Sequence, residues 1–176
     1  MERGVTSVSI NVKSSCTNVI LGEKTRIIGG KNAIEEEIGP LTFTISPTSF
    51  FQVNPIQTER LYQAAMEMAE LTGTEVVWDA YCGAGTISLF LAQKAKQVYG
   101  VEVVEAAVRN AWENAVKNEM DNVEFFVGKA EQVIPEHFRR TGIRPDVIVV
   151  DPPRAGCDEA LLHTILEMKP DRMVYV

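Results

Sequence analysis

A glycine turn with an acidic residue on each side forms the first group of residues with recognisable chemistry. An apolar run, 76–78, leads into Asp79, and Gly83 and Gly85 follow closely. Glycines after a buried strand let a ligand approach the backbone, and the start of the next helix offers free N–H groups. Glu102 ends the next apolar run, 19 residues after Gly83, where a carboxylate can accept both hydroxyls of a ribose. The pattern favours a nucleoside ligand; the alternative is a structural turn with a surface glutamate.

The turn departs from the dinucleotide fingerprint in an informative way. Ser88 holds the position of the third glycine, and Asp79 stands where its carboxylate would repel a diphosphate. A carboxylate suits a ligand that carries an amino group or a positive charge. S-adenosylmethionine has both, together with a ribose, so the residues favour it over NAD.

A second acidic motif follows another apolar run. Residues 147–150 end in Asp151, and two prolines and Arg154 come next. Ligands of open α/β sheets bind at the carboxyl ends of strands, and the prolines stiffen the loop. Asp151 can therefore hydrogen-bond a cofactor or a base edge. The alternative is that this motif is only a rigid connection from the strand to the following loop. The Arg154 guanidinium can hold a substrate phosphate or carboxylate, or it can pair with Asp158 or Glu159.

A third motif, 49–55, lies between two regions of different pattern. Gln52 could reach across to a cofactor, and Phe50 or Phe51 could stack on a base. From the residue types alone, core aromatics at a junction are the favoured interpretation.

The composition limits the class of protein. The chain has 176 residues, 45% hydrophobic and 23% charged, which indicates one globular domain with at most a short appendage and excludes collagen-like and disordered chains. The net charge of −7 argues against a large phosphate-binding surface. No apolar run is long enough to cross a bilayer. Cys16, Cys82 and Cys157 lie too far apart in sequence for a metal knuckle, so we expect no metal, no membrane contact and a cytoplasmic location.

The first fifty residues favour a small antiparallel β piece. Alternation of apolar and polar residues predicts strands, with a turn at Gly29-Gly30 and a solvated turn at 35–37. The expected strands are 5–12, 19–21, 26–28 and 41–45.

From Asn54 the pattern changes to alternating helices and strands. Asn54 followed by Pro55 is a helix start, and strands that alternate with helices predict a parallel, doubly wound sheet. The expected strands are 75–79, 97–102, 123–127, 146–151 and 172–176, and the clearest later helices are 104–118 and 159–168. The residues expected to face inward are Leu61, Ala64, Ala65, Met68 and Leu71 of the first helix, Val104, Val108, Ala111, Trp112, Ala115 and Val116 of the second, and Leu162, Ile165 and Leu166 of the last.

Four motifs in this order resemble the RNA (uracil-5-)-methyltransferase family. They are Ser-Phe-Phe-Gln-Val-Asn-Pro at 49–55, Asp-Ala-Tyr-Cys-Gly-Ala-Gly-Thr at 79–86, Gly-Val-Glu at 100–102 and Asp-Pro-Pro-Arg-Ala-Gly at 151–156. The resemblance implies a class I methyltransferase Rossmann-like α/β domain at 51–176, preceded at 1–50 by part of the family's central β domain. It implies S-adenosyl-L-methionine as the cofactor, held by Gln52, Tyr81, Glu102 and Asp151, with Gly83 and Gly85 forming the turn. Thr86 stands where some members have asparagine.

The resemblance also implies a reaction that needs a cysteine. In the family a thiolate adds to C6 of uracil, C5 attacks the methyl group, and a base then removes the C5 proton to give 5-methyluridine in RNA. The family's nucleophile stands in a Ser-Cys-Asn-Pro motif after the strand that ends this chain, and its basic glutamate lies further on. We therefore expect a truncated chain whose catalytic residues lie beyond Val176, which binds cofactor but does not methylate RNA alone.

The expected substrate of the parent protein is ribosomal RNA, 23S in particular. Cys82 is interpreted as a packing residue, whereas Cys157 lies on a loop that could approach the substrate. Two alternatives stay open. One is an amino-methyltransferase that reads its base with Asp-Pro-Pro, although such enzymes usually have an aromatic where Arg154 stands. The other is a module that binds S-adenosylmethionine without catalysis.

Overall fold

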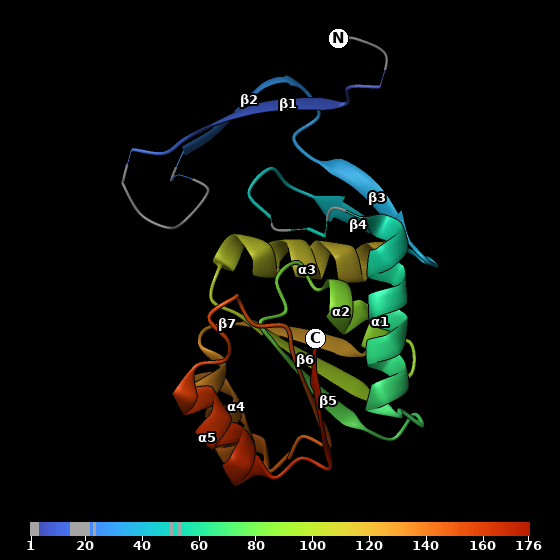
Figure 1. Cartoon of the computed structure of the whole chain (residues 1–176), viewed down its shortest axis with the longest axis vertical. Helices are drawn as coiled ribbons and strands as arrows, with labels where there is room; N and C mark the ends of the chain where they lie inside the picture. The colour runs from blue at the N-terminus through green and yellow to red at the C-terminus, as the bar shows by residue number, and fades with distance from the viewer. Residues whose placement is uncertain (1–3, 15–21, 23, 50, 53) are drawn as a thin grey trace.

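The computed structural model describes residues 4–14, 22, 24–49, 51–52 and 54–176 (Figure 1). The strand expected at 19–21 and the residues Cys16 and Phe50 lie outside the described residues.

A parallel sheet forms the centre of the molecule. In the described part of the chain its five strands have the order β7-β6-β5-β8-β9, and every neighbouring pair is parallel. The strands are β5 (Val76–Ala80), β6 (Gln97–Glu102), β7 (Val123–Val127), β8 (Val147–Val150) and β9 (Arg172–Tyr175). β8 is buried along its whole length and β5 along all but its first residue, which explains their near-continuous apolar runs. The predicted doubly wound α/β sheet is confirmed.

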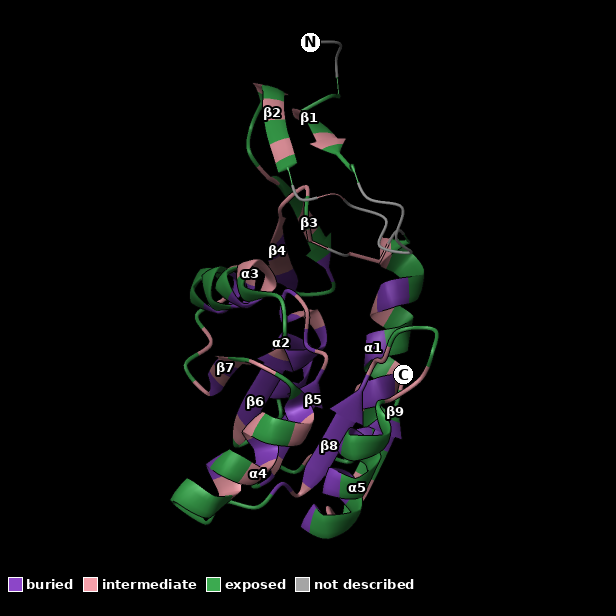
Figure 2. Cartoon of the chain, turned by 90° about the vertical axis from the view of Figure 1, so that its left-hand side faces the viewer, coloured by how far each residue is buried: buried purple, intermediate pink, exposed green. Residues whose placement is uncertain are grey.

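Helices cover both faces of this sheet (Figures 1 and 2). They are α1 (Pro55–Ala69), α2 (Thr86–Ala92), α3 (Glu105–Lys117), α4 (Ala130–Thr141) and α5 (Glu159–Met168). Side chains of α1, α2 and α3 share one core with Val77, Val98 and Val149. Side chains of α4 and α5 share a second core with Trp78 and Ile148. The alternation along each strand thus divides the sheet between two apolar clusters.

Two antiparallel hairpins precede the sheet. β1 (Ser7–Val12) pairs with β2 (Lys24–Gly30), and β3 (Ile34–Ile38) pairs with β4 (Leu41–Ile45). The predicted strands at 5–12, 26–28 and 41–45 are confirmed. Two expectations are wrong: Gly29-Gly30 lies inside β2, and residues 35–37 form the middle of β3. Three adjacent glutamates do not have the residue types typical of a strand. Residues 35–37 form a strand because their backbone pairs with β4.

The β3–β4 hairpin is fixed to α3 through its backbone. The side-chain oxygen of Asn118 accepts a hydrogen bond from the Thr42 amide at 2.9 Å, and that of Asn114 accepts one from the Thr44 amide at 2.7 Å. Phe43, between them, is fully buried in the first core. The two asparagines therefore satisfy amides on β4 that have no strand partner.

The helix start and some of the inward-facing residues agree with the sequence. Asn54 caps α1, because its side chain accepts from the Gln57 amide, and this confirms the predicted helix start. The predicted inward-facing residues that are buried are Ala65, Val108, Ala111, Ala115 and Ile165.

Ala64 and Leu71 are partly buried, and Leu71 packs against the first core. Seven other expected core positions are wrong. Leu61, Met68, Val104, Trp112, Val116, Leu162 and Leu166 are exposed, whereas Thr58, Tyr62, Asn114, Leu161 and Thr164 are buried. The buried faces include polar residues that bond backbone oxygens. Apolarity alone therefore does not identify these faces.

No helix in the described residues is both long and apolar enough to span a membrane.

Candidate functional site

The carboxyl edge of the sheet places three predicted site residues together. Ala80 of β5 is in register with Val101 of β6 and with Val150 of β8. The next residues along these strands are Tyr81, Glu102 and Asp151. Because parallel strands end at the same edge, these three residues lie next to one another, each one position after the aligned residues.

The two glycines of the turn have different surroundings. Both have positive φ, 54° at Gly83 and 80° at Gly85. A Cβ on Gly83 would have no described atom within 4 Å, whereas a Cβ on Gly85 would lie 3.0 Å from Ala111 Cβ and 3.1 Å from Phe125 Cζ. Gly85 therefore allows α3 and β7 to pack closely beneath the turn. Gly83 leaves its backbone bare toward open space, which is what a ligand needs to approach it.

Glu102 is tied to the turn by its carboxylate. One oxygen accepts from the Gly83 amide at 3.3 Å, and the other accepts from the Val104 amide at 2.9 Å. Each carboxylate oxygen has a second acceptor site. The side chain is thus held in one orientation and still has capacity to accept a pair of hydroxyl groups.

Asp79 lies beneath this edge and is fully buried. One oxygen accepts from the Ser88 hydroxyl at 2.5 Å, and the other has no hydrogen-bond partner among the described residues. Burial raises the pKa of Asp79 to about 7; the Ser88 hydroxyl lowers it, and the carboxylates of Asp151 and Glu102 raise it further. Ser88 replaces the third glycine of the fingerprint because α2 uses its hydroxyl to bind Asp79.

A pocket beside the turn, the Asp151 pocket, brings residues of the 49–55 motif together with Asp151 of the 151–156 motif. Its lining residues are Phe51, Gln52, Tyr62, Tyr81, Cys82, Gly83, Ala84, Thr86, Ile87 and Asp151. Burial raises the pKa of Asp151. The Tyr62 hydroxyl lies 3.0 Å from Thr86 Oγ1, so α1 and α2 meet at this wall. Tyr62 was expected neither in the core nor at the site. A tyrosine within a helical pattern does not by itself indicate either position.

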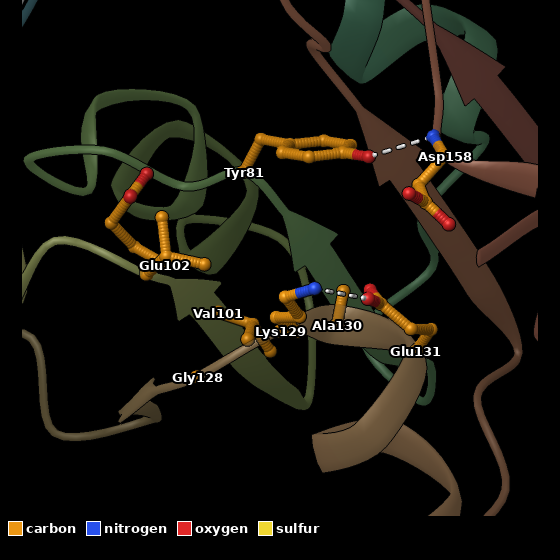
Figure 3. Close-up of a pocket in the computed structure, with 9 residues that line it drawn as sticks. Tyr81, Val101, Glu102, Gly128, Lys129, Ala130, Glu131 and Asp158 are labelled. Carbon is orange, nitrogen blue, oxygen red and sulfur yellow. Dashed lines mark hydrogen bonds and ion pairs between the residues drawn. The ribbon is translucent and has the colours of Figure 1, made fainter. Parts of the chain in front are cut away.

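A second pocket, the Glu102 pocket, shares Tyr81 with the first and has a volume of about 150 Å³. Figure 3 shows its lining, which consists of Tyr81, Val101, Glu102, Val103, Gly128, Lys129, Ala130, Glu131 and Asp158. Lys129 Nζ lies 3.8 Å from a Glu131 carboxylate oxygen. Lys129 and Glu131 were not among the expected site residues. The start of α4 at the edge of the sheet is the signal that would have placed them there.

Tyr81 contributes to both pockets. It has a φ of 77°, and its hydroxyl accepts a hydrogen bond from the Asp158 amide at 3.2 Å (Figure 3). The two pockets are therefore neighbours at Tyr81. We call the two together the track: Gln52 and Asp151 line one of its pockets, and Glu131 lines the other.

Arg154 is exposed on the loop after Asp151. No ion pair of the described residues involves Arg154. The suggested partners have other roles: Asp158 caps α5 by accepting from the Ala160 amide at 2.9 Å, and Glu159 lies 3.9 Å from His163. The Arg154 side chain is thus solvent-exposed on the loop that follows Asp151.

The surroundings of both described cysteines raise the pKa of the thiol. Burial, with Asp79 and Glu102 nearby, raises the pKa of Cys82 well above its usual value. A Cβ on Gly100 would lie 2.9 Å from Cys82 Sγ, so Cys82 fills a space that this glycine leaves, and its role in packing is confirmed. Burial also raises the pKa of Cys157. Within the described ranges, no group of three or more histidine, cysteine or acidic residues could hold a metal ion.

Comparison with known proteins gives a consistent family. The profile of tRNA (Uracil-5-)-methyltransferase matches residues 17–176. RNA methyltransferases of Clostridium tetani and Halalkalibacterium halodurans are 56% and 59% identical over 173 and 172 residues. These matches cover 98% of this chain but 37% of each relative.

Among solved structures, this chain is similar to Pyrococcus abyssi tRNA (uracil-54, C5)-methyltransferase in complex with S-adenosyl-L-homocysteine. The TM-score is 0.75 at 30% identity, over 96% of this chain and 40% of that one. The fold, the order of the motifs and the extent of these matches agree, and the chain belongs to the tRNA (uracil-5-)-methyltransferase family.

Proposed function

We propose that this chain is the S-adenosyl-L-methionine-binding part of an enzyme that forms 5-methyluridine in RNA. The observation that carries the proposal is the track formed by the Glu102 pocket and the Asp151 pocket. It combines a bare glycine backbone at Gly83, a carboxylate oriented for a diol at Glu102 and a half-buried acid at Asp151. The P. abyssi neighbour holds S-adenosyl-L-homocysteine, which supports the same ligand class here.

The residues present fit this cofactor. Glu102 is placed to accept the ribose hydroxyls, and the Glu102 pocket beyond it has room for a planar base. Gln52 and Asp151 line the other end of the track, where they can bond the amino acid part. Asp79 lies buried below the same edge with a pKa of about 7, and its ionised form favours a ligand with net positive charge.

When bound, the cofactor supplies a methyl group on a positively charged sulfur. The chain's own contribution is to bind and orient it and to leave one side of the site open to the RNA base. Arg154 lies exposed beside Asp151 and is placed to hold a phosphate or carboxylate of the substrate.

We further propose that neither described cysteine is the nucleophile. Cys82 is buried and Cys157 has a raised pKa, and a nucleophilic cysteine needs a lowered one. The relatives extend well beyond the part that this chain matches. The nucleophile and the base that removes the C5 proton are proposed to lie in that further part.

The proposed substrate is a uridine in ribosomal RNA. The family profile and the P. abyssi neighbour carry the name of tRNA enzymes. Methyl transfer by a full-length relative to 23S ribosomal RNA and to tRNA transcripts, compared side by side, decides between these targets.

The binding site is tested by calorimetric titration of this chain with S-adenosyl-L-homocysteine. Glu102→Gln and Asp151→Asn each remove a charged hydrogen-bond acceptor, so each should weaken binding about 10- to 100-fold. Glu105→Gln is the matched control, because Glu105 is exposed and pairs only with Arg109 among the described residues. Unchanged affinity in both site variants would overturn the assignment.

A further inference from the structure

The β1–β2 hairpin stands apart from the rest of the molecule. Figures 1 and 2 both show it projecting beyond β3 and β4, at the end of the molecule far from α4 and α5. None of its described residues belongs to either core. A two-stranded hairpin without a core is marginally stable by itself, so a projecting one is suited to contact a partner.

One face of this hairpin combines apolar and basic side chains. Ile10 lies opposite Arg26 and Val12 lies opposite Lys24, and directly opposed residues share a face. All four are exposed, Ile10 at 50% and Val12 at 56%. We call these four residues the ribbon face. The aliphatic stems of Lys24 and Arg26 can lie along the β-branched side chains, which leaves the cationic ends directed outward.

The charge on this hairpin is opposite to that of the body. Residues 1–33 contain five Lys or Arg and two Asp or Glu, a net charge of +3, whereas residues 34–176 contain 12 and 22, a net charge of −10. Within the described residues, no ion pair involves Lys24 or Arg26. Their charges are therefore not neutralised by the acidic body.

This separation of charge determines which partner fits. A polyanion is repelled by the body and attracted by the hairpin, so it is oriented as it approaches. Side chains reach the phosphates and 2′-hydroxyls of an A-form RNA helix but not the bases in its deep groove. Two cations on a narrow hairpin match contacts of that kind.

We propose that the ribbon face binds the sugar-phosphate backbone of the RNA substrate, outside the site where the base is methylated. The proposal rests on the proposed function, since it takes RNA as the substrate. The hairpin leads through β3 and β4 into the segment that carries Gln52. The β3–β4 hairpin thus separates the RNA contact from the segment of Gln52 along the chain, and the contact carries no sequence information.

The test is RNA binding measured by fluorescence anisotropy at increasing salt. The probe is a labelled RNA hairpin, titrated with the whole chain between about 50 and 200 mM KCl. The double variant Lys24→Gln/Arg26→Gln should lower the slope of log K against log salt by about 1.5, because two phosphate contacts are lost. The matched control is Lys94→Gln/Lys96→Gln, two exposed cations on the body, and it should leave the slope unchanged.

Calorimetry with S-adenosyl-L-homocysteine separates failure of this proposal from failure of the proposed function. Equal slopes in the two double variants, or no RNA binding by a chain that binds the cofactor product, would overturn the ribbon proposal alone. Tighter binding to anionic lipid vesicles than to RNA at equal salt would also overturn it. A chain that binds RNA through the ribbon face but not the cofactor product would leave the ribbon proposal standing and refute the cofactor site.

Discussion

Replacing Asp79 with asparagine removes an acid whose burial holds its pKa at about 7 instead of the usual 3.8. Between these two values the folded chain keeps a proton on Asp79 that the unfolded chain has lost. The stability of the folded state therefore falls as pH rises through this window and levels off above pH 7. The full penalty for keeping Asp79 ionised in the fold is about 4 kcal/mol. Asparagine has nearly the same shape and stays neutral throughout.

The measurement is urea unfolding of wild type and Asp79→Asn at pH 5 and pH 8, followed by tryptophan fluorescence. Trp78 is fully buried next to Asp79 in β5, so it reports on this core. From pH 5 to pH 8 the asparagine variant should gain about 2.5 kcal/mol in unfolding free energy relative to wild type. Most other titrating groups are common to both proteins and cancel in the difference.

A stability difference that is the same at both pH values would refute the reasoning, because Asp79 would then have an ordinary pKa. Ser88→Ala is the companion variant. The Ser88 hydroxyl lowers the pKa of Asp79, so its loss should extend the fall in stability to higher pH. The same logic extends to binding: a ligand with positive charge should bind more tightly at pH 8 than at pH 6, and Asp79→Asn should lose that dependence.

Two further predictions concern the turn and the strand that leads into it. Gly83→Ala should weaken binding of S-adenosyl-L-homocysteine at least tenfold in calorimetry, because its Cβ enters open space beside the site. Gly85→Ala should lower the unfolding free energy in urea by about 2 kcal/mol, because its Cβ meets packed atoms. Loss of binding in Gly85→Ala and loss of stability in Gly83→Ala, the reverse result, would contradict this prediction. Burial opposes ionisation of Glu75, yet hydrogen bonds from the hydroxyl and amide of Thr72 and the amide of Gly73 lower its pKa to about 2. Glu75→Gln should therefore cost about 2 kcal/mol above pH 4.5, after allowance for solvent screening, and this cost should vanish as pH falls toward 2; a loss that persists at pH 2 would point to packing instead.

The sheet and its site edge were predictable from the sequence for a physical reason. Parallel strands that are covered on both faces are apolar along most of their length, so the central runs β5, β6 and β8 are visible without knowledge of their neighbours. Residues that follow such runs must meet at one edge. Glu102 and Asp151 each end an expected strand, which is enough to group these two side chains. Tyr81 lies two residues beyond the expected strand 75–79, and only the family resemblance assigned it to the site.

The helices and the first hairpins were less predictable, because their environment depends on tertiary contacts. Asn114 is fully buried, and its side chain bonds the Thr44 amide and the Ala84 carbonyl oxygen. A search for apolar residues at helical spacing therefore does not find Asn114. β3 contains three successive glutamates, and its strand form comes from pairing with β4, which local propensity does not encode.

Tyr81 shows a further limit of sequence reasoning and its connection to function. A left-handed conformation at a tyrosine is unfavourable and is kept only when its surroundings hold it. Here the Tyr81 amide donates to the Val101 carbonyl oxygen at 3.0 Å, and the hydroxyl accepts from the Asp158 amide at 3.2 Å. The first bond ties the backbone to β6, and the second ties the ring to the start of α5. Because the same ring lines both pockets, any ligand that fills the track must contact a side chain fixed at both ends. The strain is thus located at the one described side chain that lines both pockets.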